Sequence, residues 1–247
     1  MTVEAFDDYP EPMNSAKRAY QASLKLGTTK GADRSRAVLA MARALKRSFD
    51  DILEANTLDL EASREMAVPE LILDWLKLTP SRLENTVEIL QRLGELSDPL
   101  RRVRNADYQQ EDSQSYTQLM PLGVIGFIYE AFPELGAIAA GFCLKTGNTV
   151  ILKGSTEASH SNAAIAEVMQ TAISEVGLPP GCIELVTTEH GTSLRDLVTQ
   201  GQYLSLVIPY GRSSLIQQVV RQATCPVLKS AMGNCYLYWS LNGSLEM

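Results

Sequence analysis

The stretch that decides the fold reads Asn148-Thr149-Val150-Ile151-Leu152-Lys153-Gly154-Ser155-Thr156-Glu157-Ala158. Its first half is a short, continuous apolar run, typical of a parallel strand covered on both faces. Gly154 lets the backbone approach a ligand closely, and Ser155 or Thr156 can cap the helix that follows. The free N–H groups of that helix favour an anion, and Lys153 adds a positive charge beside them. The string alone is equally compatible with a simple turn next to a solvated lysine.

Composition limits the classes of protein to consider. The chain has 247 residues, of which 45% are hydrophobic and 21% charged, enough to bury one large core or two smaller ones. A formal net charge of -7 argues against general affinity for nucleic acid or an anionic membrane. The four cysteines show no CxxC pairing and there are two histidines, so no metal site is expected. No apolar stretch approaches membrane-spanning length, and we expect a cytoplasmic protein with reduced thiols.

The first part of the chain has a helical pattern. Residues 14–92 are rich in Ala, Leu, Glu, Lys and Arg, with apolar residues three and four apart, which indicates amphipathic helices. Pro69 and Pro80 lie near the starts of later helices, where proline is tolerated. Residues 101–118 are polar and suggest an extended arm or hairpin whose open edge could pair with a partner subunit. Composition fits a solvated loop equally well.

After Pro121 the pattern alternates between strands and helices joined by short connections. It predicts an α/β fold with a doubly wound, mostly parallel sheet preceded by N-terminal helices. We therefore expect a helical part at 1–100, an arm and possible oligomerisation hairpin at 101–120, and an α/β nucleotide-binding core at 121–247. The expected strands are 123–129, 150–152, 182–186, 204–208, and 227–228 with 236–239; the expected helices are 133–145, 158–176, 192–200 and 213–222.

Three turns follow strands of this sheet, at residues 129–133, 153–156 and 209–213. They could bring Lys153, Arg212 and the N-termini of helices to one anionic ligand, most naturally a nucleotide. The G-x-G-x-x-G fingerprint of the standard dinucleotide turn is absent. His160 and His190 have no Cys, Ser or carboxylate at motif spacing and are expected to be structural or solvated. Cys235 begins a strand-like run and is expected to be buried and inert. No nucleophile is assigned within the chain.

Four motifs follow one another along the second half of the chain: Pro121-Leu122-Gly123-Val124-Ile125-Gly126 with Tyr129-Glu130-Ala131, then Cys143-Leu144-Lys145-Thr146-Gly147-Asn148-Thr149-Val150-Ile151-Leu152-Lys153-Gly154, Gly177-Leu178-Pro179-Pro180-Gly181 and Leu206-Val207-Ile208-Pro209. In this order they resemble the γ-glutamyl phosphate reductase family, also called glutamate-5-semialdehyde dehydrogenases, within the aldehyde dehydrogenase superfamily. The resemblance covers essentially the whole chain and is strongest over residues 121–238.

The resemblance implies NADPH-dependent reduction of γ-glutamyl phosphate to glutamate 5-semialdehyde, with release of phosphate, in proline biosynthesis. In this chemistry a cysteine thiolate displaces phosphate to give a thioester, hydride from the nicotinamide reduces it, and the hemithioacetal releases the aldehyde. The family's thiol lies in a later Cys-Asn motif in a separate catalytic domain. We therefore expect the nucleophile beyond Met247, and a chain that carries the cofactor-binding part and is inactive alone.

Carried over by position, the resemblance assigns residues to the cofactor and to the substrate cleft. Lys153 and Glu157 reach the adenosine ribose, Gly154 and Ser155 line that site, and Gly211, Arg212 and Ser213 lie by the pyrophosphate. Tyr129, Glu130 and Asn148 match positions near the active cleft. Where the family usually reads Tyr-Glu-Ala-Arg-Pro-Asn, this chain has Phe132 and Glu134 in place of the Arg and the Asn. Where it reads Pro-Arg-Gly-Gly, this chain has Tyr210 and Arg212 in place of the Arg and the last Gly.

Two other functions fit the same residues. The chain could be a non-catalytic, degenerate paralogue that acts as an interaction or regulatory subunit, forming a homo-oligomer or pairing with a full-length homologue through the arm. It could also be an enzyme that uses Cys235 as a substitute thiol.

Overall fold

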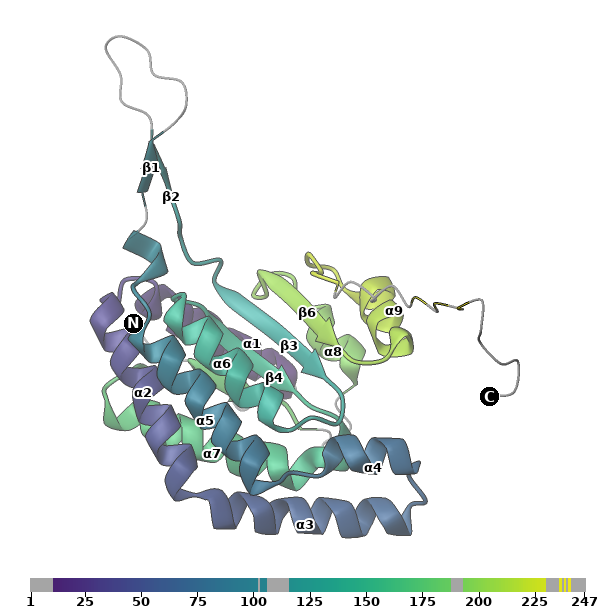
Figure 1. Cartoon of the computed structure of the whole chain (residues 1–247). Helices are drawn as coiled ribbons and strands as arrows, with labels where there is room; N and C mark the ends of the chain where they lie inside the picture. Colours follow the sequence, from purple (N-terminus) through teal and green to yellow (C-terminus); the bar gives the residue numbers. More distant parts are fainter. Residues whose placement is uncertain are drawn as a thin grey trace, which may run out of the picture.

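The computed structural model describes residues 11–101, 103–105, 116–187, 193–229, 236, 238 and 240 (Figure 1). Five helices come first: α1 Glu11–Leu26, α2 Gly31–Arg47, α3 Phe49–Glu65, α4 Glu70–Leu76 and α5 Pro80–Glu95. A 3-10 turn, Pro99–Arg101, leads to β1 Val103–Asn105 and β2 Tyr116–Gln118. The remaining elements are β3 Val124–Tyr129, α6 Glu134–Lys145, β4 Thr149–Lys153, a 3-10 turn at Thr156–Ala158, α7 Ser159–Glu175, β5 Ile183–Leu185, α8 Leu194–Val198, β6 Leu206–Tyr210 and α9 Ser213–Gln222.

The helix starts follow the local sequence signals. Pro69 directly precedes α4, and Pro80 is the first residue of α5. Proline fits there because its missing N–H would have no partner in the first helical turn. The Thr79 hydroxyl accepts the backbone N–H of Arg82 at 3.2 Å and so caps α5. Both proline positions are as predicted.

Four parallel strands form the main sheet in the order β5-β4-β3-β6. Val124 of β3 lies opposite Thr149 of β4, and Ile125 of β3 lies opposite Leu206 of β6. The chain adds β4 and β5 on one side of β3 and then returns to add β6 on the other. The predicted doubly wound α/β fold is therefore confirmed, and its topological switch point lies between β3 and β6.

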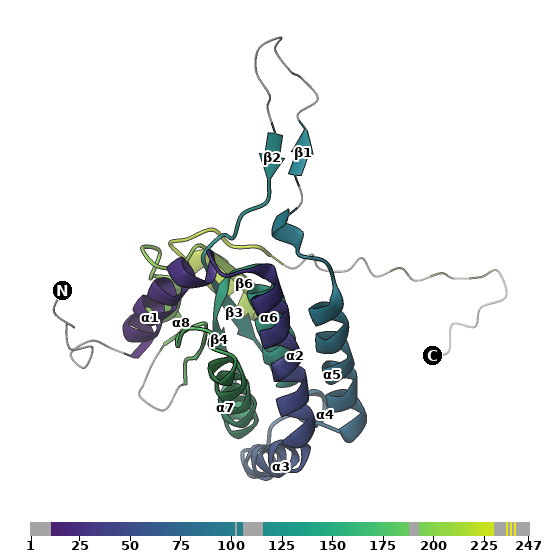
Figure 2. The same ribbon diagram turned by 90° about the vertical axis from the view of Figure 1, so that its left-hand side faces the viewer.

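Helices cover both faces of this sheet, and each face has its own apolar core. Phe127 and Leu152 belong to the core that includes residues of α2, α5, α6 and α7. Their neighbours in the strands, Ile128 and Ile151, belong to the core that includes residues of α1, α8 and α9. This alternation is the two-residue period of a strand buried on both sides. Figure 2 shows α1 and α8 on one side of the sheet and α2, α5 and α6 on the other.

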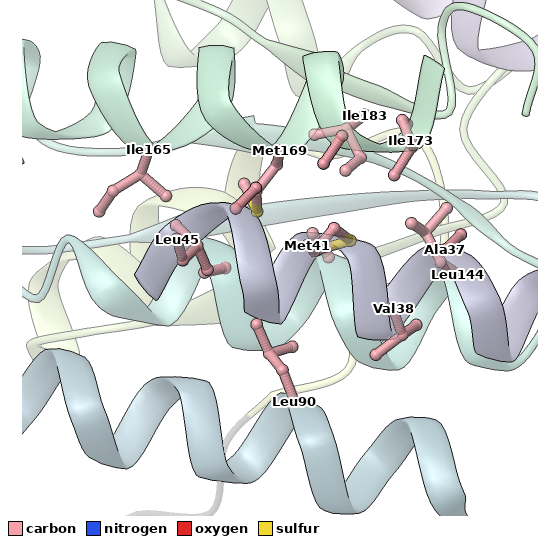
Figure 3. Close-up of a cluster of buried hydrophobic side chains, with 14 of the residues drawn as sticks. Ala37, Val38, Met41, Leu45, Leu90, Leu144, Ile165, Met169, Ile173 and Ile183 are labelled. Atoms are coloured by element: carbon pink, nitrogen blue, oxygen red, sulfur yellow. The ribbon is translucent and has the colours of Figure 1, made fainter. Parts of the chain in front are cut away.

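The larger core continues beyond the sheet into the helices of the first part of the chain. Figure 3 shows α2 sandwiched between α7 and α5, with Met41 and Leu45 facing Met169 and Ile165. Met41, Leu90, Ile165 and Met169 are all at most 1% exposed. The first five helices are therefore packed against the α/β part over a shared apolar interior.

The arm predicted for residues 101–118 contains a hairpin stem. β1 and β2 pair antiparallel, with Val103 opposite Gln118, and project away from the body of the molecule (Figure 1). Tyr116 in β2 and Met120 just after it are exposed. The stem is therefore an extended element outside the cores.

The last predicted strand differs from the structure. Val227 makes an isolated parallel bridge to Val207 of β6, supported by the Leu228 N–H donating to the Val207 carbonyl at 2.9 Å. Tyr236 and Tyr238 have no secondary structure and are 88% and 90% exposed. The prediction is therefore confirmed in part at 227–228, where the chain pairs with β6 through a single bridge, and it is wrong at Tyr236 and Tyr238; residues 237 and 239 lie outside the described residues.

Within the described ranges, no helix has the length and apolar character needed to cross a membrane.

Candidate functional site

The turns that follow β3, β4 and β6 lie along one edge of the sheet. Ile128 is opposite Lys153 and Tyr129 is opposite Tyr210, so the three strands end at nearly the same level. Glu130, Gly154 and Gly211 follow these strand ends. Because parallel strands end at a common edge, the three predicted turns do come together, at the place where doubly wound sheets bind ligands.

Glu130 and Arg212 form an ion pair across the switch point. The Arg212 backbone N–H donates to Glu130 Oε2 at 2.7 Å, its Nε donates to the same oxygen at 3.2 Å, and its Nη2 donates to Oε1 at 3.1 Å. Arg212 is also the N-cap residue of α9, where its side chain makes no capping hydrogen bond. A side chain at Gly211 would place its Cβ 2.6 Å from Glu130 Oε2. A side chain at position 211 would therefore have to displace the Glu130 carboxylate, which fills that space.

The loop after β4 lies beside this ion pair. The Ala131 N–H, in the turn after β3, donates to Ser155 Oγ at 3.4 Å and so joins the two loops. Hydrogen bonding to Glu130 and the charges of Glu130 and Glu157 raise the pKa of Arg212 above its usual value. Glu157 thus acts electrostatically on the same guanidinium. Lys153, the last residue of β4, is buried.

The turn between β3 and α6 has an unusual backbone. Ala131 has φ of +58° and is 3% exposed. A residue with a Cβ rarely adopts this left-handed conformation, and such strain persists only where surrounding contacts enforce it. Glu130, held by Arg212, and Ser155, which accepts the Ala131 N–H, provide these contacts.

The start of α7 is capped differently from the prediction. The α-helix begins at Ser159, and neither Ser155 nor Ala158 makes a side-chain cap. Asp59 of α3 accepts the backbone N–H groups of His160 and Ser161, at 3.0 and 2.8 Å. The prediction of a local cap is therefore wrong, since these N–H groups are already bound to a carboxylate from another helix and are not free for a phosphate.

Gly154 and Tyr129 are both explained by one side chain that sequence reasoning missed. A Cβ at Gly154 would overlap the Asn162 amide, so glycine is needed for an internal contact. The Tyr129 hydroxyl donates to Asn162 Oδ1 at 2.9 Å, and the ring stacks on Phe127 within the larger core. Burial, and then the charge of Glu134, raises the Tyr129 pKa. Tyr129 is a core residue, and its assignment to a position near the active cleft stays a prediction. Only a long-range contact links it to Asn162, so no local motif could reveal the pair.

Asn148 lies at the opposite edge of the sheet from the other predicted residues. It directly precedes β4, whereas Lys153 ends that strand. Its side-chain Oδ1 accepts the N–H groups of Leu122 and Gly123 at 2.7 and 3.0 Å. Asn148 therefore fixes the entry into β3, and its assignment to the substrate cleft stays a prediction.

The two departures from the family pattern at positions 132 and 134 form one cluster. Phe132 stacks on Trp75, with ring centroids 5.5 Å apart, and the Arg82 guanidinium lies 5.4 Å from the Phe132 ring centroid. Arg82 Nε donates to Glu134 Oε1 at 2.9 Å. Arg82 on α5 thus supplies a cation beside position 132, and Glu134 balances its charge. Neither Trp75 nor Arg82 carries a motif that sequence reasoning could detect.

The described cysteines are unsuited to nucleophilic chemistry. Cys143, Cys182 and Cys225 are free thiols. Burial raises the pKa of Cys143 and of Cys182 from 9.0 to about 12, and it also raises the pKa of Cys225. An activated thiol needs the opposite shift. Cys235 and His190 lie outside the described residues. No cluster of three or more metal-ligating side chains occurs in the part of the chain that the structure describes.

The cavities are not concentrated at this edge. A small cavity of about 20 Å³ lies beside Gly154, Ser155 and Asn162. A groove of about 430 Å³ lies between α1 and α7, next to Arg18 and Glu184. The groove is separate from the turns after β3, β4 and β6, so the candidate site is an open edge and not an enclosed pocket.

The sequence of the chain is similar to those of known proteins. The model of the aldehyde dehydrogenase family matches residues 5–233. The chain belongs to the aldehyde dehydrogenase family. It is 56% identical over 229 residues to "Gamma-glutamyl phosphate reductase 2" of Synechocystis, an alignment that covers 93% of this chain and 54% of that relative. It is 43% identical over 233 residues to "Gamma-glutamyl phosphate reductase" of Gloeobacter violaceus, covering 94% of this chain and 55% of that relative.

Solved structures agree with the sequence comparisons. The crystal structure of gamma-glutamyl phosphate reductase from Thermotoga maritima matches with a TM-score of 0.86 and 32% identity, covering 92% of this chain and 55% of that one. The family resemblance seen in the sequence is thereby confirmed. The chain spans about half the length of the curated relatives it matches.

Proposed function

We propose that this chain is the cofactor-binding part of a γ-glutamyl phosphate reductase, an oxidoreductase that reduces γ-glutamyl phosphate to glutamate 5-semialdehyde with NADPH in proline biosynthesis. The observation that carries the proposal is 56% identity across 93% of the chain to a reductase of that name. The sheet supports it, because charged residues and a glycine turn meet at the switch point between β3 and β6.

The residues at this edge suit the parts of a dinucleotide. Lys153 can donate to ribose hydroxyls and Glu157 can accept from them. Gly211 leaves room for the backbone to approach a phosphate, and the start of α9 at Arg212 and Ser213 offers N–H groups and a positive charge. Bound NADPH would supply the hydride; these residues would bind and orient it. Gly154 and Ser155 shape the loop that holds Lys153 and Glu157 in place.

The catalytic thiol is proposed to lie outside these 247 residues. Reduction of an acyl phosphate through a thioester needs a thiolate. Burial raises the pKa of Cys143, Cys182 and Cys225, the opposite of what an activated thiol needs, and Cys235 lies outside the described residues. We therefore expect the chain to bind NADPH without turning over γ-glutamyl phosphate.

Titration of NADPH against protein fluorescence tests this function. Wild type should show saturable binding, and Lys153→Met should raise the Kd roughly tenfold or more, because a hydrogen bond from a charged donor contributes about 1.5–3 kcal/mol. Lys77→Met, which changes an exposed lysine at the end of α4, serves as the control and should bind as wild type does. Absence of saturable binding, or equal Kd values for wild type and Lys153→Met, would contradict the cofactor assignment.

A second function is favoured by the projecting hairpin. β1 and β2 stand away from both cores, and Tyr116 and Met120 are exposed at 64% and 78%. Such a stem can pair with another subunit, so the chain could act as a non-catalytic interaction subunit of a full-length homologue. Co-purification with that homologue, lost on replacing residues 103–118 with a short Gly-Ser linker, would support this function. A strictly monomeric protein in sedimentation, with no co-purification, would count against it.

A further inference from the structure

The Glu130 carboxylate occupies the place where a phosphate would meet the start of α9. Its Oε2 accepts the Arg212 backbone N–H at 2.7 Å, and both oxygens accept from the guanidinium at 3.2 and 3.1 Å. It also fills the space that Gly211 leaves open, since a Cβ there would lie 2.6 Å from Oε2. The Arg212 N–H and guanidinium, which could bind an external anion, are thus already bound to an internal one.

The two partners differ in how firmly they are held. The Glu130 side chain is 16% exposed, whereas the Arg212 side chain is 58% exposed. The Glu130 backbone N–H donates to the Tyr210 carbonyl at 3.1 Å, which fixes the main chain of the turn between the two strand ends. Only side-chain rotation is therefore needed to free the Arg212 N–H, while the backbone of both turns stays in place.

Charge makes the place exclusive. The charge of Glu157 also raises the pKa of Arg212, so the guanidinium lies in the field of two carboxylates, of which Glu130 is the one in contact. A phosphate brought to Gly211 would lie in the same space as Glu130 Oε2, and like charges at that separation repel strongly in a partly buried setting. Glu130 and a phosphate cannot both occupy the start of α9.

We propose that Glu130 competes with the phosphates of the ligand for Arg212 and the start of α9, and thereby sets the affinity of this site for phosphate-bearing ligands. The inference rests on the proposed function, which places a dinucleotide at this edge. Ligand phosphate displaces the carboxylate, takes over the Arg212 N–H and guanidinium, and leaves Glu130 to turn toward solvent. Glu130 is an affinity-determining residue, and Arg212 is the group that both anions share.

Calorimetric titration of two ligands, NADPH and inorganic pyrophosphate, tests the competition. Glu130→Gln keeps the size of the side chain and removes its charge, so it should lower the Kd for both ligands about two- to fivefold, the range expected when a partly exposed ion pair no longer competes. Arg212→Gln should raise the Kd for both.

Glu184→Gln is a matched control, because Glu184 makes an equivalent pair with Arg18, at 3.0 and 2.6 Å, next to the groove between α1 and α7. It should leave both Kd values unchanged. All variants should retain the wild-type far-ultraviolet circular dichroism spectrum.

The outcomes separate the two proposals. An unchanged or higher Kd for pyrophosphate in Glu130→Gln overturns the competition. Tighter pyrophosphate binding in Glu130→Gln, together with no saturable NADPH binding in any variant, supports the competition and overturns the cofactor assignment. Tighter binding of NADPH and of pyrophosphate in Glu130→Gln supports the competition and the cofactor assignment together.

Discussion

Replacing Asp59 with alanine should strongly destabilise the fold, because this side chain caps a helix from a distance. Its Oδ1 accepts the His160 backbone N–H at 3.0 Å and lies 2.8 Å from His160 Nδ1. Its Oδ2 accepts the backbone N–H and the hydroxyl of Ser161 at 2.8 and 2.6 Å. The carboxylate is 2% exposed and joins α3 to the first turn of α7, directly after the candidate cofactor loop.

The magnitude follows from the groups left without partners. A hydrogen bond to a charged group contributes about 1.5–3 kcal/mol, and removing one partner of a buried charged interaction costs about 3–5 kcal/mol. The four contacts share one side chain, so their contributions do not add. Asp59→Ala should therefore lower the free energy of unfolding by about 3–5 kcal/mol. In Asp59→Asn the amide oxygen can still accept hydrogen bonds, but the NH₂ group replaces the second oxygen and faces N–H donors. This variant should lower the free energy of unfolding by about 2–3 kcal/mol.

Urea unfolding followed by far-ultraviolet circular dichroism measures these changes. Glu61→Gln, an exposed carboxylate on the same helix, is the control and should stay within about 0.5 kcal/mol of wild type. A change below about 1 kcal/mol in Asp59→Ala would refute the view that α7 depends on a cap from α3.

Two further predictions follow from buried side chains. Burial raises the pKa of the Cys182 thiol from 9.0 to about 12 in the folded chain. As the pH rises, the thiol therefore ionises in the unfolded chain before it ionises in the folded one. The free energy of unfolding is unaffected well below pH 9 and falls between pH 9 and pH 12. Between pH 8 and 10, the free energy of unfolding in urea should fall by about 1 kcal/mol more in wild type than in Cys182→Ala. An equal fall in both proteins would contradict the raised pKa of Cys182. Phe132→Ala removes the ring stacked on Trp75 at 5.5 Å, which should cost about 1–3 kcal/mol and shift tryptophan emission to longer wavelength; an unchanged spectrum would contradict the stacking.

Local pattern was enough to predict the main elements of the sheet. The apolar run at 150–152 lies within β4, the helix expected at 213–222 matches α9, and the turns after β3, β4 and β6 meet at one edge. These features depend on periodicity and on the rule that parallel strands share an edge, both of which act over short stretches of chain. The strand expected at 227–228 is reduced to a single parallel bridge between Val227 and Val207 of β6.

Side-chain contacts between distant residues could not be predicted in this way. Asn148 and Lys153 are five positions apart, yet they lie at opposite edges of the sheet, because β4 is extended between them. Tyr129 directly precedes Glu130, yet its ring points into the core while the Glu130 carboxylate meets Arg212. Residues that adjoin in a motif thus have different roles, set by the alternation of a strand and by partners elsewhere.

The sequence by itself determined the order of the main elements, because apolar periodicity is a local property, and its ordered motifs indicated the family. It also predicted a candidate site at the turns that follow β3, β4 and β6. The tertiary structure decided which groups at that site are already engaged. The start of α7, predicted to be open to a phosphate, is capped by Asp59, and the start of α9 holds Glu130. Asp59 and Ser161 are 102 positions apart, and Glu130 and Arg212 are 82 apart. Only the folded chain brings these pairs together, because each depends on how separate helices and strands pack.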